Sequence, residues 1–376
     1  MQKIFPIVVF SVIMAALSHR NSGYDPIECR YYRKERLFYT VMSVALILFA
    51  GLRTFYNDTS VYLYGYKTIS QNPNWYEEIV WSKIGDNPAF TFVQGVMVKL
   101  NFSSQTFLLV FSAFTVGVNL WFFRKYSCNL WMTVLLYLVF AVYIFSLAAI
   151  KQCTAMAICL IATDRAINKK YIRFVLYVLL ASLFHPYALM YLIVPLLFFR
   201  PWSKYTGIML VVFGIIGFSM QSLIGTLLDV TDMLGENYNA ASFTGEGVNP
   251  IRLLVTAVPV ALSFLAAEQI AEDEEKDQYL ILNLTMLNAE IMFVGLFGTA
   301  NYFARLANYF IPFQALSIPW LLKHYDYNSR RTITLVASVC YVLFFIYNNG
   351  IQESFDAHFY STPLWAYLKT LFQGVF

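Results

Sequence analysis

A succession of long apolar stretches is the feature of this sequence that most restricts its fold. Most of them are about 15–22 residues long, and about 20 apolar residues suffice for a helix to cross the hydrocarbon of a bilayer. We expect helices at 3–18, 38–54, 87–100, 105–123, 130–149, 152–167, 172–184, 187–199, 206–228, 250–268, 279–299, 303–322 and 332–347. Backbone groups in lipid must be paired within the protein, and no stretch alternates as a strand would. The sequence therefore predicts an all-α, polytopic transmembrane helical bundle of about 11–13 helices, some of them short or re-entrant.

The composition supports a single integral membrane domain over residues 1–376. Only 13% of the residues are charged, whereas soluble domains carry about 25%. No internal repeat is visible, and the apolar stretches leave no room for a separate soluble domain. The opening segment 1–17 lacks a clear cleavage site before the basic loop that follows, so we expect a retained helix.

Neither nucleic acid nor a metal ion is predicted as a partner. The basic residues are scattered over short loops and do not form the continuous patch that nucleic acid requires. The cysteines show no metal-ligand spacing; they are Cys29, Cys128, Cys153, Cys159 and Cys340. Cys153 and Cys159 share one apolar stretch, where a cysteine usually serves as a small hydrophobic residue.

Lysine and arginine in the short loops set the expected orientation, because these residues are retained on the cytoplasmic side. The loops 20–36, 164–173 and 323–331 are rich in both, so we expect them in the cytoplasm. The loops 55–86 and 229–249 are long, polar and poor in both residues. We therefore expect these two loops to be extracytoplasmic.

This orientation requires two segments that do not cross the membrane as single helices. Segment 172–199 must leave the cytoplasmic side and return to it, as two helices of about 20 Å each. We expect the break between them at His185-Pro186, because proline cannot continue a helix. The short stretch 87–100 is expected to dip into the outer leaflet without crossing.

Five basic residues at the ends of apolar stretches fall at one depth in this topology, on the extracytoplasmic side. They are Arg53, Lys151, His185, Arg252 and Arg305. A charge in or near hydrocarbon costs about 2.5–3.5 kcal/mol, so such residues are kept mainly where function requires them. Arginine binds phosphate bidentately and lysine binds it as a point charge, so the shared depth predicts a pocket for a lipid-linked diphosphate. Each residue alone is also compatible with a role as an interfacial anchor or helix end.

The loop 55–86 adds groups that could contact a sugar. Its aromatic, amide and acidic residues are Asn57, Asp58, Tyr62, Tyr64, Trp75, Tyr76 and Trp81. Such groups stack on sugar rings and hydrogen-bond to sugar hydroxyls. An aromatic belt at the membrane interface has the same composition, and both interpretations remain open here.

Four short motifs follow one another between about residues 40 and 320. They are Gly51-Leu52-Arg53 with Asn57-Asp58-Thr59 and Tyr62; Lys151-Gln152 with Ala155 and Ala157; the run from Ala181 to Pro186; and Ala304-Arg305-Leu306 with Tyr309-Phe310. In this order they resemble the signature of the EpsG family, which groups with Wzy-like O-antigen and exopolysaccharide polymerases. Two positions depart from that signature. Lys151 replaces an arginine and keeps only its charge, and Asn57 replaces a glycine but can also adopt a left-handed turn.

The resemblance implies a glycosyltransferase that acts as a polysaccharide polymerase at the outer face of a bacterial cytoplasmic membrane. Such an enzyme moves a growing glycan from undecaprenyl diphosphate onto the next lipid-linked repeat unit. On this interpretation Arg53, Lys151, Arg305 and Arg252 bind the diphosphate, where positioned cations stabilise the leaving charge. His185 or Asp58 serves as general base, and we favour His185 because an ordinary histidine titrates near pH 6.5. Gln152, Tyr62 and Tyr309 are assigned to the sugar.

The expected partners follow from the same reasoning. They are undecaprenyl-diphosphate-linked oligosaccharides, the lipid bilayer, and a chain-length regulator and flippase of the same pathway. No nucleotide motif is present and the donor is lipid-linked, so no cofactor is expected. No cluster of acidic residues on the outer side demands a metal ion.

Three other functions would also use part of this pattern. A flippase or transporter of lipid-linked oligosaccharide needs a basic cavity, although the chain shows no paired halves. A glycosyltransferase that uses a polyprenyl-phosphate sugar usually places acids in its first outer loop, where Asp58 stands with Glu77 and Glu78 further along. A membrane acyltransferase would need a histidine reachable from the cytoplasm, which His185 fits poorly.

Overall fold

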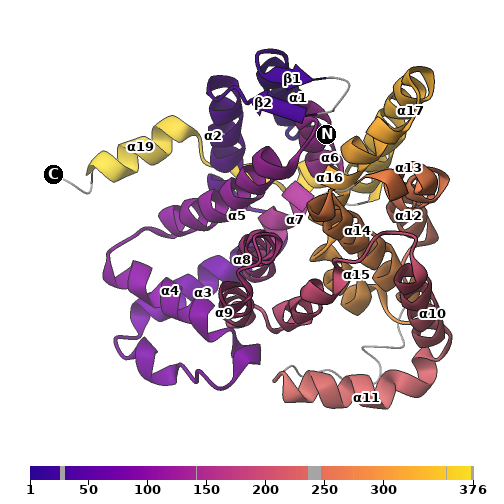
Figure 1. Ribbon diagram of the computed structural model, residues 1–376. Coiled ribbons are helices and arrows are strands. Elements are labelled where there is room, and N and C mark those ends of the chain that lie inside the picture. The colour runs from indigo at the N-terminus through magenta and orange to yellow at the C-terminus, as the bar shows by residue number, and fades with distance from the viewer. Residues whose placement is uncertain (26–29, 141, 236–246, 274, 353, 374–376) are drawn as a thin grey trace.

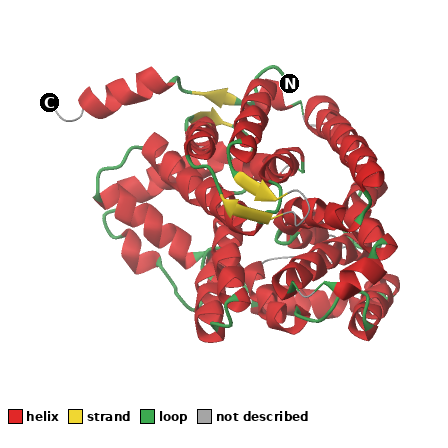
Figure 2. Cartoon of the chain, turned by 45° about the horizontal axis from the view of Figure 1, so that its top comes forward, coloured by secondary structure: helices red, strands yellow, loops and turns green. Residues whose placement is uncertain are grey.

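The computed structural model confirms an all-α architecture: it is 78% helical with almost no sheet. It describes residues 1–25, 30–140, 142–235, 247–273, 275–352 and 354–373 (Figure 1). In these ranges the strands are β1 (Gly23–Asp25), β2 (Arg30–Arg33), β3 (Arg53–Phe55) and β4 (Tyr360–Ser361), which form two small antiparallel sheets, β1-β2 and β3-β4, among the helices (Figure 2). The expectation that the chain lacks strands therefore holds for the bundle and misses these short pairings.

Each expected stretch contains a helix, and further helices lie outside these stretches, such as Phe355–His358 and Leu364–Gln373. In the first half they are α1 (Phe5–Arg20), α2 (Leu37–Gly51), α3 (Thr59–Gln71), α4 (Pro88–Lys99), α5 (Ser104–Tyr126), α6 (Leu130–Val139), α7 (Val142–Ala148), α8 (Ile150–Ile167), α9 (Tyr171–Ser182) and the 3₁₀ helix η3 (Pro186–Leu197). In the second half they are α10 (Lys204–Phe218), α11 (Met220–Met233), α12 (Pro250–Leu265), α13 (Ala267–Glu272), α14 (Lys276–Val294), α15 (Ala300–Asn308), α16 (Ile311–Leu321), α17 (Tyr327–Ile346), α18 (Phe355–His358) and α19 (Leu364–Gln373). The stretches 130–149, 206–228 and 303–322 each divide into two helices, and the expected outer loop 55–86 contains α3. Of the other expected outer loop, residues 236–246 lie outside the described ranges.

A few of the described helices have the length and apolar composition needed to cross a membrane. Among the described residues, α5 and the segment Tyr327–Ile351 are long and apolar enough to cross a membrane singly. The bent pairs α6-α7 (46°) and α10-α11 (93°) would add two more if each pair is one span. Several shorter apolar helices, including α9 and η3, accompany them. The fold is thus that of an all-α membrane protein, while the number of spans and the re-entrant course of 87–100 and 172–199 stay predictions.

Helix α8 lies at the centre of the bundle and packs against α5, α9 and η3 (Figure 1). Its buried face carries small side chains such as Ala155, Cys159 and Ala162. Small residues let neighbouring helices approach closely, which is how helices associate where no water is displaced. A second group of helices forms around α14, which contacts α10, α12, α15 and α16.

The loops expected in the cytoplasm gather at one end of the bundle. Lys34 Nζ lies 3.3 Å from the Lys125 carbonyl oxygen at the end of α5, and Lys125 pairs with Asp164 at the end of α8. Gln278, in the first turn of α14, donates to the Tyr126 carbonyl oxygen at 3.3 Å. The first part of loop 55–86 instead lies near the start of α8, at the opposite end. The basic loops and the start of loop 55–86 thus lie at opposite ends, and the side of the membrane that each end faces stays a prediction.

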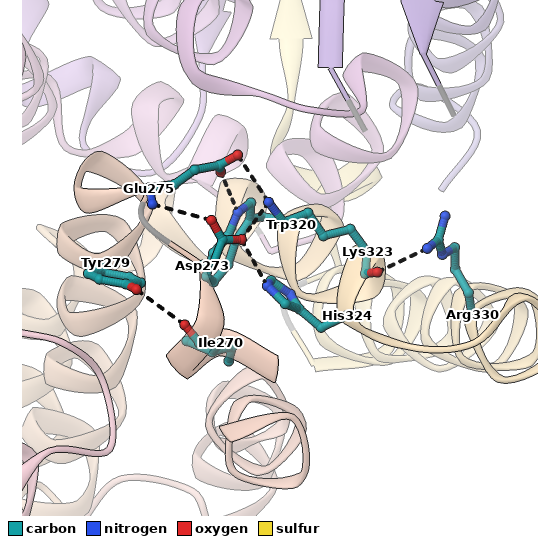
Figure 3. A network of polar contacts seen from close by, with 8 residues as sticks. All are labelled: Ile270, Asp273, Glu275, Tyr279, Trp320, Lys323, His324 and Arg330. Atoms are coloured by element: carbon teal, nitrogen blue, oxygen red, sulfur yellow. Dashed lines mark hydrogen bonds and ion pairs between the residues drawn. The ribbon is translucent and has the colours of Figure 1, made fainter. Parts of the chain in front are cut away.

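A network of polar contacts lies at the end of the bundle where these basic loops gather. We call it the α13–α14 network (Asp273, Glu275, Lys323 and His324; Figure 3). Lys323 Nζ lies 2.6 Å from Asp273 Oδ2 and 3.0 Å from Glu275 Oε1. His324 Nε2 lies 3.2 Å from Asp273 Oδ2, and Trp320 Nε1–H donates to Glu275 Oε2 at 2.8 Å. The network joins the start of α14 to the end of α16.

Candidate substrate-binding site

A cavity of about 540 Å³ opens at the other end of the bundle, and we call it the basic cavity. Its volume falls in the range of about 300–1,000 Å³ typical of ligand pockets. Seven of the residues singled out from the sequence line it, and they are Asp58, Tyr62, Lys151, Gln152, His185, Arg252 and Arg305. They come from segments far apart in the chain. Four of them were predicted from the sequence to lie at one depth, namely Lys151, His185, Arg252 and Arg305.

His185 occupies the break between α9 and η3. Its backbone is extended (φ −161°, ψ 119°), and Pro186 begins the next helix, so the predicted break is confirmed. Tyr309 Oη lies 3.0 Å from His185 Nδ1, and the Tyr187 ring meets the imidazole edge to face, with 4.9 Å between ring centroids. Two tyrosines therefore hold the imidazole, and His185 also lines the basic cavity.

Lys151 and Gln152 stand in the first turn of α8. The Lys151 ammonium lies 5.4 Å from the centre of the Phe90 ring of α4. Buried Gln152 donates from Nε2 to the Arg305 carbonyl oxygen at 2.6 Å, which ties the start of α8 to α15. Gln152 thus fixes the backbone at Arg305, and the sequence did not reveal this role.

Arg305 extends from α15 and is exposed to the cavity. Helix α15 is held from beneath by a chain of amides: Gln314 Nε2 donates to Asn288 Oδ1 and Asn288 Nδ2 to the Ala307 carbonyl oxygen, both at 2.6 Å. Buried amides paired in this way fix a backbone firmly because an unpaired partner would be costly. The arginine is consequently carried on a rigid support.

Arg252 enters from the first turn of α12. Asn249 caps that helix by accepting from the Ile251 amide at 2.9 Å, and Pro250 starts it. Cap and proline together set where the helix begins, and hence where Arg252 meets the cavity.

Asp58 and Tyr62 form the opposite wall, at the start of α3. Asn57 precedes them with φ +42°, the left-handed conformation expected where the family signature has a glycine. Asp58 is exposed, whereas the Tyr62 hydroxyl reaches the backbone amides of Ile150 and Lys151. Tyr62 therefore links this wall to the start of α8.

Two of the predicted site residues do not line the basic cavity. Arg53 is only 1% exposed, and its guanidinium donates to the Ala50 carbonyl oxygen, to Ser112 Oγ at 3.1 Å and to Thr59 Oγ1 at 3.3 Å. Tyr309 is fully buried beneath His185. The structure places both behind the wall, where they position other groups.

The electrostatics of the basic cavity favour an anion. Lys151, Arg252 and Arg305 line it, and Asp58 is the only carboxylate among its described lining residues. Burial, together with the positive charges of Arg305 and Lys151, lowers the pKa of His185 to about 3. The imidazole is thus neutral at physiological pH, and Lys151 and Arg305 line the same cavity.

Three further amides line the basic cavity without having been predicted from the sequence: Asn87, Asn308 and Asn348. For Asn87 the sequence did offer a signal, because an asparagine directly before a proline is typical of a turn. In the structure Asn87 has φ +55°, in the left-handed region. Nothing in the local sequence of Asn348, which lies in the π-helical turn η6 (Tyr347–Gln352), points to the site. Among the described residues, no group of three His, Cys, Asp or Glu side chains could hold a metal ion.

Comparison with known proteins gives one finding. The model of the EpsG family matches residues 36–360, which is most of the chain. No curated protein and no solved structure gives a significant match.

Proposed function

Because the chain belongs to the EpsG family, we propose that it is a polysaccharide polymerase of the bacterial cytoplasmic membrane. It transfers a growing glycan from undecaprenyl diphosphate to a lipid-linked repeat unit, with the basic cavity facing outside. The family supports a polymerase-type membrane protein of exopolysaccharide synthesis.

The observation that carries the proposal is the convergence of Lys151, Arg252, Arg305 and neutral His185 on one cavity. A diphosphate leaving group must depart as an anion, and fixed cations aimed at that position stabilise its charge. A neutral imidazole beside those cations can accept a proton from a sugar hydroxyl. One cavity therefore supplies both groups that glycosyl transfer needs.

In the proposed step, an acceptor hydroxyl oxygen attacks the anomeric carbon of the donor glycan. The bond between that carbon and the diphosphate oxygen breaks, and the diphosphate leaves as an anion held by Arg305, Lys151 and Arg252. The hydroxyl proton passes to His185 Nε2. This requires the tautomer in which Nδ1–H donates to Tyr309 Oη, so Tyr309 positions the base.

The bound diphosphate also changes the strength of the base. Its negative charge offsets the cations that lower the pKa of His185, so the pKa rises when substrate binds. His185 is then a stronger base in the complex than in the free protein. Asp58, on the facing wall, is proposed to orient the acceptor sugar together with Tyr62.

The lipid-linked glycan profile of cells tests the proposal. Cells with Arg305→Ala should accumulate single repeat units on their carrier, facing outwards, at an unchanged protein level. Arg331→Ala, an exposed cation at the opposite end of the bundle, should give normal polymer. Long polymer in the Arg305 variant would remove this residue from the mechanism. Repeat units trapped on the cytoplasmic leaflet would identify a flippase instead.

A further inference from the structure

An apolar groove runs along the outside of the bundle between α12 and α17, and we call it the lipid groove. Its volume is about 460 Å³, and nearly all of its lining is apolar, including Leu254, Val258, Leu262, Ile333, Val336 and Tyr341. Leu254 and Val336 are 67% and 55% exposed at its rims, whereas Ala337 (8%) and Tyr341 (3%) form its floor. The groove is therefore open sideways, on the edge of the molecule where α12 and α17 lie (Figure 1).

The two helices run in opposite directions, with the groove between them. Tyr325, just before α17, donates to the Leu262 carbonyl oxygen at 2.6 Å near the end of α12. Tyr341, late in α17, donates to the Val255 carbonyl oxygen at 3.4 Å near the start of α12. The groove thus has one end near Leu262 and the other near Leu254.

The Leu254 end lies close in the chain to residues that line the basic cavity. Arg252 lines the cavity, while Leu254, half a turn further along α12, lines the groove. On the other side, Asn348 lines the cavity about 10 Å along the chain from Tyr341, at a helical rise of 1.5 Å per residue. An apolar groove open to the side therefore has one end two residues from Arg252, a cation of the basic cavity.

We propose that the lipid groove holds the first isoprene units of the polyprenyl chain while the attached diphosphate lies against Arg252. This inference rests on the proposed function, because it assigns a position to that substrate's tail. The junction matches the ligand's own sequence of groups, with an apolar chain joined to a dianionic head. Entry from the side also lets the head reach the cavity while the tail stays in lipid.

The groove orients the substrate more than it adds affinity. Lipid tails are as apolar as the groove, so moving a polyprenyl chain from bilayer to groove gains little hydrophobic free energy. Correct placement of the reacting phosphate, in contrast, changes rate steeply, and an error of about 1 Å can cost about a hundredfold. Filling the groove should therefore lower turnover of long-chain substrates specifically.

Val336→Trp fills the groove from an exposed rim, and Leu335→Trp is the matched control because Leu335 is 65% exposed and does not line it. Each purified variant is given repeat units on undecaprenyl diphosphate and on a short, detergent-soluble prenyl diphosphate. We expect Val336→Trp to lower kcat/KM about tenfold for the long-chain substrate only. Leu335→Trp should change neither value. Equal losses for both substrates, or no loss for either, would overturn the assignment.

A second measurement uses the wild-type chain and needs no polymerisation. Cys340 lines the groove and is exposed, whereas Cys128 lies near the opposite end of the bundle. Undecaprenyl diphosphate should slow alkylation of Cys340 by a maleimide, as followed by mass spectrometry, and leave Cys128 unchanged. Undecaprenol or a phosphatidylglycerol at the same concentration should not protect Cys340. Equal protection by all three lipids would show an ordinary lipid contact.

The two measurements separate the groove from the function. If wild-type protein polymerises neither substrate, the proposed function fails. The alkylation test still decides whether the lipid groove binds undecaprenyl diphosphate. If wild-type protein polymerises both and Val336→Trp behaves as wild type, the polymerase stands and the groove assignment falls.

Discussion

Two arginines of the same family signature have opposite environments. Arg53 is enclosed and donates to Ala50, Ser112 and Thr59, whereas Arg305 is exposed to the basic cavity on a braced helix. Arg53 thereby joins the end of α2 to the start of α3, next to Asp58. The sequence shows only an arginine at the end of an apolar stretch in both cases. An arginine buried among hydrogen-bond acceptors and an arginine that faces a ligand have the same local sequence, so the two roles could not be told apart.

Substitution should separate these two roles. Arg53→Ala should lower the free energy of unfolding by roughly 2–4 kcal/mol, because buried acceptors lose their donors and a void remains. Arg305→Ala should leave the unfolding temperature in detergent nearly unchanged and abolish polymerisation. Thermal unfolding followed by fluorescence, with a parallel activity assay, checks both. A folded, equally stable Arg53→Ala protein would contradict the structural role.

The pH dependence of activity should report the cations around His185. Because burial, Arg305 and Lys151 lower the pKa of His185 to about 3, kcat/KM should not fall through histidine protonation between pH 8 and about 5. The acid limb of kcat should lie at higher pH, since the bound diphosphate favours the imidazolium. Lys151→Gln removes one cation and should move the acid limb of kcat/KM upwards. An acid limb near pH 6.5 that is unaffected by Lys151→Gln would argue against His185 as the base.

Among the secondary-structure elements, the breaks between helices form the basic cavity. The cavity lies where α9 breaks before η3, where α7 gives way to α8, and where α12 begins after Asn249. The His185-Pro186 break was predictable because proline prevents helix continuation. The division of 130–149 into α6 and α7 was not, since no proline or glycine marks it. Apolar length alone cannot distinguish a straight span from a bent one.

The α13–α14 network gives a second, independent pH effect on stability. Burial and the Lys323 charge lower the pKa of His324, so the unfolded chain binds more protons than the native one below about pH 6.5. Stability should therefore fall as the pH drops from 7 to 5, and His324→Gln should show a shallower fall. Unfolding temperatures of the two proteins across this range test it. Parallel curves would remove His324 as a source of the pH dependence.

In the molecule as a whole, the two ends of the bundle carry different polar groups. The loops rich in lysine and arginine meet at one end around the α13–α14 network, and the basic cavity opens at the other. The relative placement of the loops was predictable, because charge in short loops follows topology. The cavity's outline was not, because Asn348 reaches it through tertiary packing alone.

Side-specific labelling tests how this molecule sits in the membrane. In a cysteine-free background, Ser60→Cys, next to Asp58 and exposed, should react with an impermeant maleimide added to intact cells. Arg331→Cys should react only after the membrane is opened. The reverse pattern would place the basic cavity in the cytoplasm and exclude the proposed orientation.

The measurement that tests the central claim most directly is polymerisation by the purified protein in liposomes. Lipid-linked single repeat units are supplied alone, and glycan length and free undecaprenyl diphosphate are both measured. We expect a ladder of products with one undecaprenyl diphosphate released per bond formed, and no ladder from Arg305→Ala. Wild-type protein that moves repeat units across the bilayer without lengthening them would contradict it.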